Sequence, residues 1–441
     1  DREGSVRFLM SDNGSMQILQ EKFGVSAAAA ELCERAEKRA AAQFTHIESN
    51  AAYNQLKVLS AFQENRVSYV HFGETSGYGY DDLGRDTLDK IFADIFGAED
   101  AMVRYNIVSG TQAIALCLFG VLRTGDTLVS VAGRPYDTME EVIGLRGEAG
   151  VGSLKDFGIS YDQVDLLADG TVDYAGIRTK AAEVKPKAVL IQRSKGYDWR
   201  DSLNIETIGK IIDTVKAVSP DTVCIVDNCY GEFVERREPT EVGADLVVGS
   251  LIKNAGGSLA PAGGYVVGRA KYVELVSYRF TAPGLGKHIG ATLGMNRSLY
   301  QGLFMAPHIV EQSLKTAVLC AAVCEELGYD VCPSSQAERT DIIQAVRLGN
   351  AENVIKFCQA IQKGSPIDSF VSPEPWDMPG YEHPVIMAAG AFIQGASIEL
   401  SADAPICEPY TAYMQGGIVY DAAKVGILKA AEALISHEGS C

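Results

Sequence analysis

The spacing of apolar residues changes several times along the chain. Residues 26–64 are rich in alanine and charged residues, with apolar positions near helical spacing, and they predict one long helix. A shorter helix is expected from Thr87 to Phe96, ending at Gly97. Short β-branched runs then alternate with helical segments, which is typical of an α/β domain with a mostly parallel central sheet. The predicted strands are 127–131, 188–192, 222–227, 245–249 and 264–268.

The predicted strands are almost continuously apolar, so helices should cover both faces of this sheet. Beyond about residue 300 the pattern becomes that of a smaller α+β region. Its expected elements are a helix over 306–326, strands over 342–348 and 391–400, a helix over 351–362, a loop over 365–380 and a terminal helix over 422–437. We therefore expect an N-terminal helical segment (1–65), a large α/β domain (66–300) and a small α+β C-terminal domain (301–441).

Charge and composition restrict the classes of partner. With 57 acidic and 39 basic residues among 441, the net charge of −18 makes nucleic acid an improbable partner. No apolar run reaches the roughly 18 residues that a membrane span needs. Residues 1–10 lack the pattern of a signal peptide, so a cytoplasmic protein is expected. The ten cysteines form no CxxC pair, which argues against structural zinc, and no metal is expected.

Lys253 is the first candidate for chemistry. It follows the apolar run 245–249 in Ser250-Leu-Ile-Lys253, at the sheet edge where α/β folds bind ligands. Desolvation there would lower the pKa of the lysine and make it a nucleophile toward aldehydes. Taken alone, Lys253 fits better as a surface lysine in a loop.

Three more features fall after predicted strands. Asp227 ends the run 222–226 and could pair with a protonated pyridine nitrogen, or it could cap a turn with Asn228. Ser109-Gly110-Thr111 opens a helix and could cradle a phosphate, or it could be an ordinary N-cap. Tyr136 follows the next strand, where its ring could stack on a cofactor or simply belong to a turn. Their order resembles that of fold-type I pyridoxal-5′-phosphate (PLP) enzymes, which have the aspartate aminotransferase-like fold.

Longer stretches make the resemblance more specific. The chain is similar to the methionine gamma-lyase-like, or aluminium-resistance protein, family, a branch of the cystathionine lyase relatives among the PLP enzymes of Cys/Met metabolism. The similarity extends from about Phe44 to the C-terminal helix. Its motifs are His71-Phe-Gly-Glu-Thr-Ser-Gly77-Tyr78-Gly79-Tyr80, Ser109-Gly-Thr111, Pro135-Tyr-Asp-Thr-Met-Glu-Glu-Val-Ile-Gly144, Gln192-Arg-Ser-Lys-Gly-Tyr197, Asp227-Asn-Cys-Tyr-Gly-Glu232 and Arg279-Phe-Thr-Ala-Pro-Gly284.

The resemblance implies a role for each matched residue. Lys253 would carry PLP as a Schiff base and shuttle protons, Asp227 would hold the pyridine nitrogen and Tyr136 would stack on the ring. Tyr78 would reach the phosphate of a neighbouring subunit, which implies a homodimer or homotetramer with active sites at the interface. The remaining expected residues are Ser109, Gly110, Thr111 and Ser250 at the phosphate, Gln192 near the ring oxygen, and Arg193, Arg279 and Tyr80 at the substrate.

Two positions depart from the family pattern. Gln112 stands where the family has histidine, and Cys407 stands where the stretch Ser401-Ala-Asp-Ala-Pro-Ile would be followed by arginine. Fold-type I enzymes usually bind the substrate carboxylate through an arginine of the small domain, a bidentate contact that cysteine does not make. Arg193, Arg200 and Arg279 are the alternatives for that contact.

The implied activity is that of a PLP-dependent carbon–sulfur lyase. It would act on a sulfur-containing or other β- or γ-substituted amino acid and release a 2-oxo acid and ammonia. Two alternatives stay open: a γ-replacement transferase or aminotransferase with the same residues, and a non-catalytic PLP-binding regulatory protein.

Overall fold

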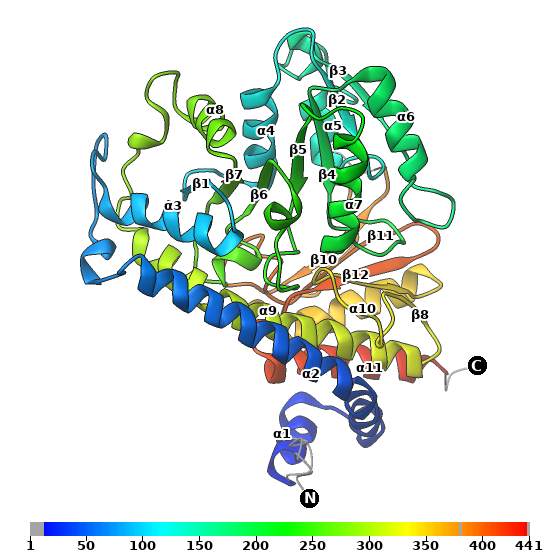
Figure 1. The fold of residues 1–441 in the computed structure, drawn as a ribbon. Helices are drawn as coiled ribbons and strands as arrows, with labels where there is room; N and C mark the ends of the chain where they lie inside the picture. The colour runs from blue at the N-terminus through cyan, green and yellow to red at the C-terminus, as the bar shows by residue number, and fades with distance from the viewer. Residues whose placement is uncertain (1–12, 379–381, 439–441) are drawn as a thin grey trace, which may run out of the picture. The chain divides into compact units, whose positions relative to one another are not determined.

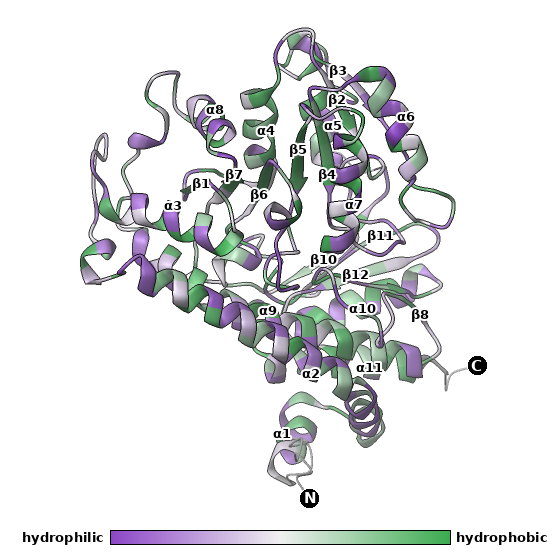
Figure 2. Ribbon diagram, viewed as in Figure 1, coloured by the Kyte–Doolittle hydropathy of each residue, from purple (hydrophilic) through white to green (hydrophobic). Residues whose placement is uncertain are grey.

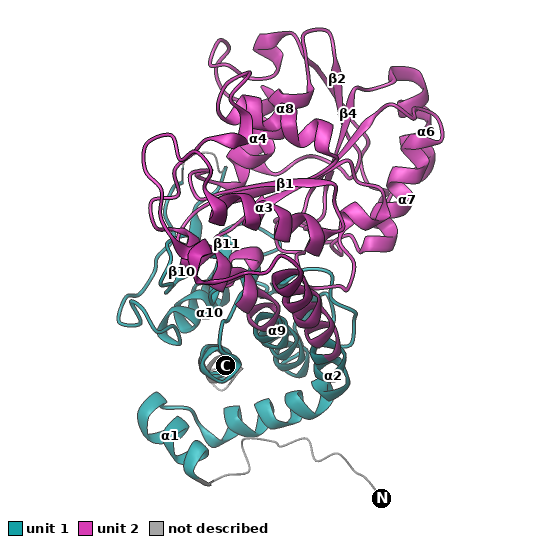
Figure 3. Ribbon diagram, turned by 60° about the vertical axis from the view of Figure 1, so that its left-hand side comes forward, with its two compact units in different colours: residues 1–48, 311–441 teal, residues 49–310 magenta. Residues whose placement is uncertain are grey.

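The computed structural model describes residues 13–378 and 382–438. The chain divides into two compact units, residues 1–48 with 311–441 and residues 49–310 (Figure 3). Both boundaries fall inside long helices, α2 (Ala27–Glu64) and α9 (Asn296–Glu326). The division therefore differs from the expected boundaries at residues 65 and 300, because the first part of α2 groups with the C-terminal unit.

The unit of residues 49–310 contains a seven-stranded sheet in the order β1-β7-β6-β5-β4-β2-β3 (Figure 1). Strands β3, β2, β4, β5 and β6 are parallel, whereas β7 is antiparallel to both β6 and β1. The predicted mostly parallel sheet is confirmed. The strands are β1 (Asp100–Arg104), β2 (Thr127–Ser130), β3 (Ser160–Gln163), β4 (Ala188–Gln192), β5 (Val223–Asp227), β6 (Leu246–Ser250) and β7 (Gly264–Gly268).

Helices cover both faces of this sheet, since nearly every residue of β4 to β7 is buried. Alternate strand residues pack against α4, α5 and α8, among them Leu128, Leu190, Ile225 and Val248. In Figure 2 the central strands are mostly hydrophobic, whereas the helices around them carry both hydrophilic and hydrophobic residues. The helices are α3 (Leu83–Phe96), α4 (Gly110–Val121), α5 (Asp137–Ile143), α6 (Tyr174–Val184), α7 (Ile205–Lys216) and α8 (Ala270–Phe280), with short 3-10 turns at Tyr69–Phe72, Lys155–Phe157, Pro239–Val242, Asn254–Gly256 and Gly286–His288.

The other unit contains a five-stranded antiparallel sheet in the order β10-β11-β12-β9-β8. Its apolar core gathers side chains from α2, α9, α10, α11 and the sheet. Its elements are α1 (Asn13–Phe23), β8 (Asp330–Cys332), β9 (Gln344–Arg347), α10 (Ala351–Lys363), β10 (Val385–Ala389), β11 (Ser401–Pro405), β12 (Thr411–Gln415) and α11 (Tyr420–Glu438). No described helix is long and apolar enough to cross a membrane.

Two predictions in the C-terminal third were wrong. The apolar run 391–400 is not a strand but a turn between β10 and β11. The Glu399 carboxylate accepts the Phe392 and Ile393 N–H groups there, and Gly395 adopts a positive φ of 79°. Helix α9 begins at Asn296 rather than at residue 306, with Pro307 inside it.

Candidate active site

A cavity of about 220 Å³ lies at the carboxyl ends of β4, β5 and β6 and at the N-terminus of α4. We call it the cofactor cavity. All eight residues expected to bind the cofactor line it: Ser109, Gly110, Thr111, Tyr136, Gln192, Asp227, Ser250 and Lys253. Their roles as cofactor ligands stay predictions, but the fold brings them to one place.

The strand register explains why these side chains meet. Gln192 and Asp227 are directly paired in neighbouring parallel strands, and Asp227 pairs with Val248, two residues before Ser250. Because side chains alternate between the two faces of a sheet, Gln192, Asp227 and Ser250 share one face. That face is the one covered by α4, since Val248 packs against it.

The N-terminus of α4 forms one wall of the cavity. Ser109 is the N-cap, and its hydroxyl accepts the Gln112 N–H at 3.0 Å. The first N–H groups of a helix have no partner within it, and together with the helix dipole they favour an anion. A Cβ on Gly110 would lie 3.4 Å from Cys229 Sγ, so glycine keeps this wall open. The Gln112 side chain instead accepts the Val108 N–H at 2.6 Å and holds the preceding loop.

Tyr136 is held by Gln192. The Tyr136 N–H donates to Gln192 Oε1 at 2.7 Å, and Gln192 Nε2 donates to the Ser194 carbonyl at 3.1 Å. Gly196 has a positive φ of 59°, and a Cβ there would lie 3.5 Å from the Tyr136 ring. Gln192 therefore positions the tyrosine as well as lining the cavity.

Asp227 and Lys253, two of the ionisable groups that line the cavity, perturb each other. Burial raises the pKa of the Asp227 carboxyl, while Lys253 and the Cys229 N–H, 3.1 Å from Asp227 Oδ1, oppose this rise. Burial lowers the pKa of Lys253, but the acidic groups of Cys229, Tyr230, Asp227 and Tyr136 outweigh it and raise the pKa above the ordinary value. Desolvation lowers the Lys253 pKa as expected, but its acidic neighbours act in the opposite direction.

Cys229 and Tyr230 line the cavity and were not expected there. Lys253 Nζ lies 4.4 Å from the centroid of the Tyr230 ring. Tyr230 has a positive φ of 74°, a left-handed turn that brings the chain back past Asp227. The sequence offered one signal for their place in the cavity, which is that they follow the strand-end carboxylate of Asp227 by two and three residues. Nothing in the sequence indicates the left-handed turn.

Arg193 faces away from the cavity. Its guanidinium is fully buried and donates to Asn228 Oδ1 at 2.8 Å and to Glu235 Oε2 at 2.6 Å, with Glu238 at 3.9 Å. We call Arg193, Asn228, Glu232, Glu235 and Glu238 the buried carboxylate cluster. The prediction that Arg193 approaches the substrate is corrected, because its guanidinium is bound by these partners and Arg193 does not line the cavity.

The cavity lining also lacks the other residues expected at the substrate, and it lacks Tyr78, which was expected at the phosphate of a neighbouring subunit. Arg279, on α8, lines a different pocket, 5.1 Å from the Phe119 ring centroid. Tyr78 and Tyr80 are 68% and 66% exposed, with rings stacked at 5.4 Å. Arg200 is buried behind the cavity and donates to the Ser194 carbonyl at 2.9 Å.

No arginine is among the residues that line the described cavity, and Cys407 belongs to the other unit. Cys407 is half-buried, and burial raises the pKa of its thiol. Within the described residues no group of three or more His, Cys, Asp or Glu is arranged to hold a metal ion.

Comparison with known proteins assigns the family. The family model described as methionine gamma-lyase matches residues 29–435. The uncharacterized protein YnbB of Bacillus subtilis is 53% identical over 392 residues, which are 89% of this chain and 93% of that protein. L-methionine gamma-lyase of Treponema denticola is 26% identical over half of each chain.

Solved structures agree with this assignment. The structure of a carbon-sulfur lyase involved in aluminum resistance from Clostridium novyi NT is 51% identical, with a TM-score of 0.92, and the match covers 95% of this chain and 98% of that one. The PLP-dependent protein YhfS of Escherichia coli, at 18% identity and a TM-score of 0.60 over 88% of this chain and 97% of that one, shares the fold. The chain therefore belongs to the methionine gamma-lyase family of carbon–sulfur lyases, in the branch of the aluminium-resistance proteins, and has the predicted fold of the fold-type I PLP enzymes.

Proposed function

We propose that this protein is a PLP-dependent carbon–sulfur lyase that releases a 2-oxo acid and ammonia from a sulfur-containing or otherwise β- or γ-substituted amino acid. The observation that carries the proposal is the arrangement of Lys253, Asp227, Tyr136 and the N-terminus of α4 around one cavity. Together they offer an amine, a carboxylate, an aromatic ring and an anion site, the four contacts that a phosphorylated pyridine aldehyde needs.

The residues of the cavity fit PLP. The open wall at Gly110 and the capped start of α4 would receive the phosphate, with Thr111 and Ser250 beside it. Asp227 would hold the pyridine nitrogen, since its only hydrogen-bond donors in the described structure belong to Cys229. Bound PLP supplies an electron sink for negative charge that develops at the α-carbon of the substrate.

Lys253 would handle the protons. Nζ would take the α-proton from the substrate and return it further along the substrate chain, so that a sulfur group can leave. The acidic neighbours that raise the pKa of Lys253 favour its protonated form, which suits the donating half of that cycle. Tyr136, fixed by Gln192, would keep the ring in place while this happens.

A second copy of this chain would complete the site. Tyr78 and Tyr80 form an exposed aromatic pair, and the nearby side chains of Tyr69, Val70 and Leu83 are also more than half exposed. Apolar surface of this kind marks protein–protein contacts. We expect Tyr78 to reach the phosphate and Tyr80 the substrate in a partner's cavity, within a homodimer or a homotetramer.

A panel of amino acids tests the proposal. Methionine, homocysteine, cystathionine and cysteine are incubated with the PLP-loaded protein, and 2-oxobutyrate, pyruvate and ammonia are assayed. At least one should release product, and Lys253→Ala should release none. PLP binding without product from any substituted amino acid would contradict the lyase proposal and favour the regulatory alternative.

A further inference from the structure

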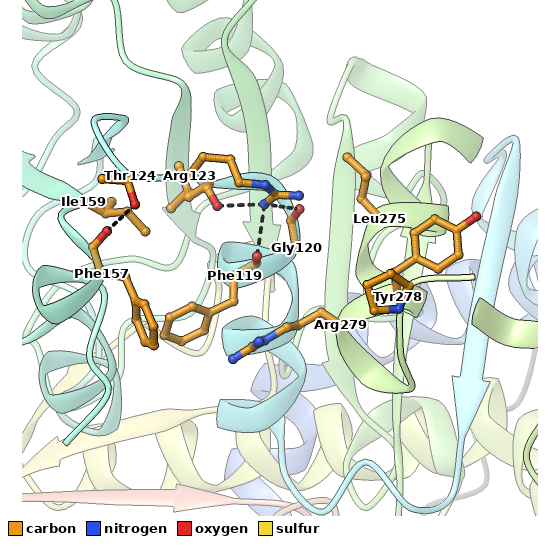
Figure 4. Close-up of a pocket in the computed structure, with 11 residues that line it drawn as sticks. Phe119, Gly120, Arg123, Thr124, Phe157, Ile159, Leu275, Tyr278 and Arg279 are labelled. Carbon is orange, nitrogen blue, oxygen red and sulfur yellow. Dashed lines mark hydrogen bonds between the residues drawn. The ribbon is translucent and has the colours of Figure 1, made fainter. Parts of the chain in front are cut away.

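A second pocket in the unit of residues 49–310 is larger than the cofactor cavity, with a volume of about 450 Å³. It lies at the opposite end of α4, where that helix ends beside α8 (Figure 4). Helix α4 has 12 residues, so its two ends are roughly 18 Å apart. Because Ser109 and Thr111 line one pocket and Phe119 and Gly120 the other, the two are separate.

The body of this pocket is apolar. Phe119 and Phe157 meet edge to face with ring centroids 5.8 Å apart, and the lining also contains Leu122, Ile159 and Leu275. Phe157 is 52% exposed although it is a large aromatic residue. A volume of this size with aromatic walls is in the range of pockets that bind small organic molecules.

Two arginines supply the charge. Arg279 stacks over the Phe119 ring at 5.1 Å, and no ion pair or hydrogen bond to its guanidinium is found among the described residues. Arg123 is fixed, since its Nη1 donates to the carbonyls of Phe119, Gly120 and Leu122 at 2.8 to 3.3 Å. Figure 4 shows the Arg279 guanidinium beside the Phe119 ring and the Arg123 guanidinium turned toward the carbonyls of Phe119 and Gly120.

The lining contains no Asp or Glu, although the chain carries a net charge of −18. Carboxylates on the same segments are engaged elsewhere. Asp126 accepts the Arg123 backbone N–H at 2.7 Å, Glu274 accepts the Tyr278 hydroxyl at 2.8 Å, and Asp156 accepts backbone N–H groups of its own loop. The pocket is thus a local concentration of positive charge on an acidic protein, next to exposed aromatic surface.

We propose that this pocket binds a small organic anion with an aromatic body, whose acidic group pairs with Arg279 and whose ring packs against Phe119 and Phe157. Arginine suits both contacts, because its planar guanidinium pairs with carboxylate, sulfonate or phosphate oxygens while it stacks on a ring. The site is independent of the lyase chemistry, since none of its lining residues lines the cofactor cavity.

Two fluorescent probes test the proposal on the PLP-loaded protein. 8-Anilinonaphthalene-1-sulfonate has the proposed chemistry, and N-phenyl-1-naphthylamine has nearly the same rings without the charge. In Arg279→Gln the sulfonate should bind about fivefold or more weakly, and the uncharged probe should change less than twofold. In Phe157→Ser both probes should bind more weakly, and this exposed position should tolerate the change.

Arg297→Gln is the matched control. Arg297 is also exposed and stacks on two aromatic rings, Tyr69 and Phe72, at 5.3 and 5.2 Å, but it does not line this pocket. Sulfonate binding should be unchanged in this variant. Unchanged sulfonate binding in Arg279→Gln, an equal loss in Arg297→Gln, or a raised KM for the amino-acid substrate with unchanged probe binding would each overturn the proposal, the last by placing Arg279 at the substrate.

Discussion

The cofactor cavity and the buried carboxylate cluster both lie at the carboxyl ends of β4 and β5. Gln192 and Asp227 face the cavity, and the residues that follow them, Arg193 and Asn228, face the cluster. In the cluster, Arg193 and Asn228 are paired with Glu235 and Glu238, whereas the amine of Lys253 in the cavity lies against the Tyr230 ring. Removing a cavity group should therefore affect ligand chemistry, and removing a cluster group should affect stability.

The largest effect is expected from Asp227→Asn. Loss of the carboxylate opposite a pyridine nitrogen should lower kcat/KM about 100-fold or more, the scale of breaking a buried charge pair. Burial raises the pKa of Asp227, so its charged form destabilises the cofactor-free protein, and the neutral asparagine should not lower the free energy of unfolding. Steady-state kinetics and urea unfolding measure the two quantities. A variant that keeps its activity, or that loses mainly stability, would place Asp227 with the structural group.

Arg193→Gln should show the opposite behaviour. It leaves Glu235 and Glu238 without their cation, and the free energy of unfolding should fall by about 3 kcal/mol or more. Arg236→Gln, an exposed arginine bound to Asn50 and Ser49, should change it by less than about 1 kcal/mol. If Arg193→Gln unfolds like the wild type but shows a raised KM, the result would support the prediction that Arg193 binds the substrate.

Glu232→Gln tests the cluster through pH. Burial raises the pKa of Glu232 from 4.5 to about 8, although the hydrogen bond from the Tyr265 hydroxyl at 2.7 Å acts to lower it. The folded protein holds this proton while the unfolded chain releases it, so stability contributed by Glu232 falls as pH rises from about 4.5 to about 8. The glutamine variant should be more stable than the wild type by a few kcal/mol at pH 8 and by much less at pH 5. Parallel stability curves for the two proteins between pH 5 and pH 8 would contradict the buried neutral acid.

The smallest effect is expected from Gln192→Ala. Loss of the Tyr136 N–H acceptor should weaken PLP binding about fivefold, the scale of one net hydrogen bond. Gln163→Ala, at the corresponding end of β3 and outside the cavity lining, should leave PLP affinity unchanged. Equilibrium titration of the cofactor-free proteins measures both, and equal affinities for all three proteins would show that Gln192 does not position the ring.

The sequence predicts the parts of this molecule that depend on local pattern. Continuous apolar runs located β4 and β7 at their observed bounds. Asp227, at the end of one such run, and Lys253, a few residues after another, do meet in one cavity. Because neighbouring side chains of an extended chain point in opposite directions, assigning Gln192 to the cavity also implies that Arg193 points away from it.

Other features depend on contacts that sequence pattern does not reveal. The run 391–400 is apolar enough for a strand, but Glu399 closes a turn there by accepting N–H groups of residues 392 and 393. The pKa of Lys253 depends on Cys229 and Tyr230, which only the left-handed turn at Tyr230 brings beside it. The pocket at Arg279 requires the ends of α4 and α8 to lie together.

Borohydride reduction followed by peptide mass mapping tests the central assignment most directly. Protein purified with PLP should be yellow, lose its colour on reduction, and carry the added pyridoxyl phosphate mass on the peptide that contains Lys253. Lys195 is a built-in comparison, because it lies between two residues that line the cavity and is itself buried. Modification of Lys253 alone is the predicted result; a mark on Lys195, or none on any peptide, would contradict it.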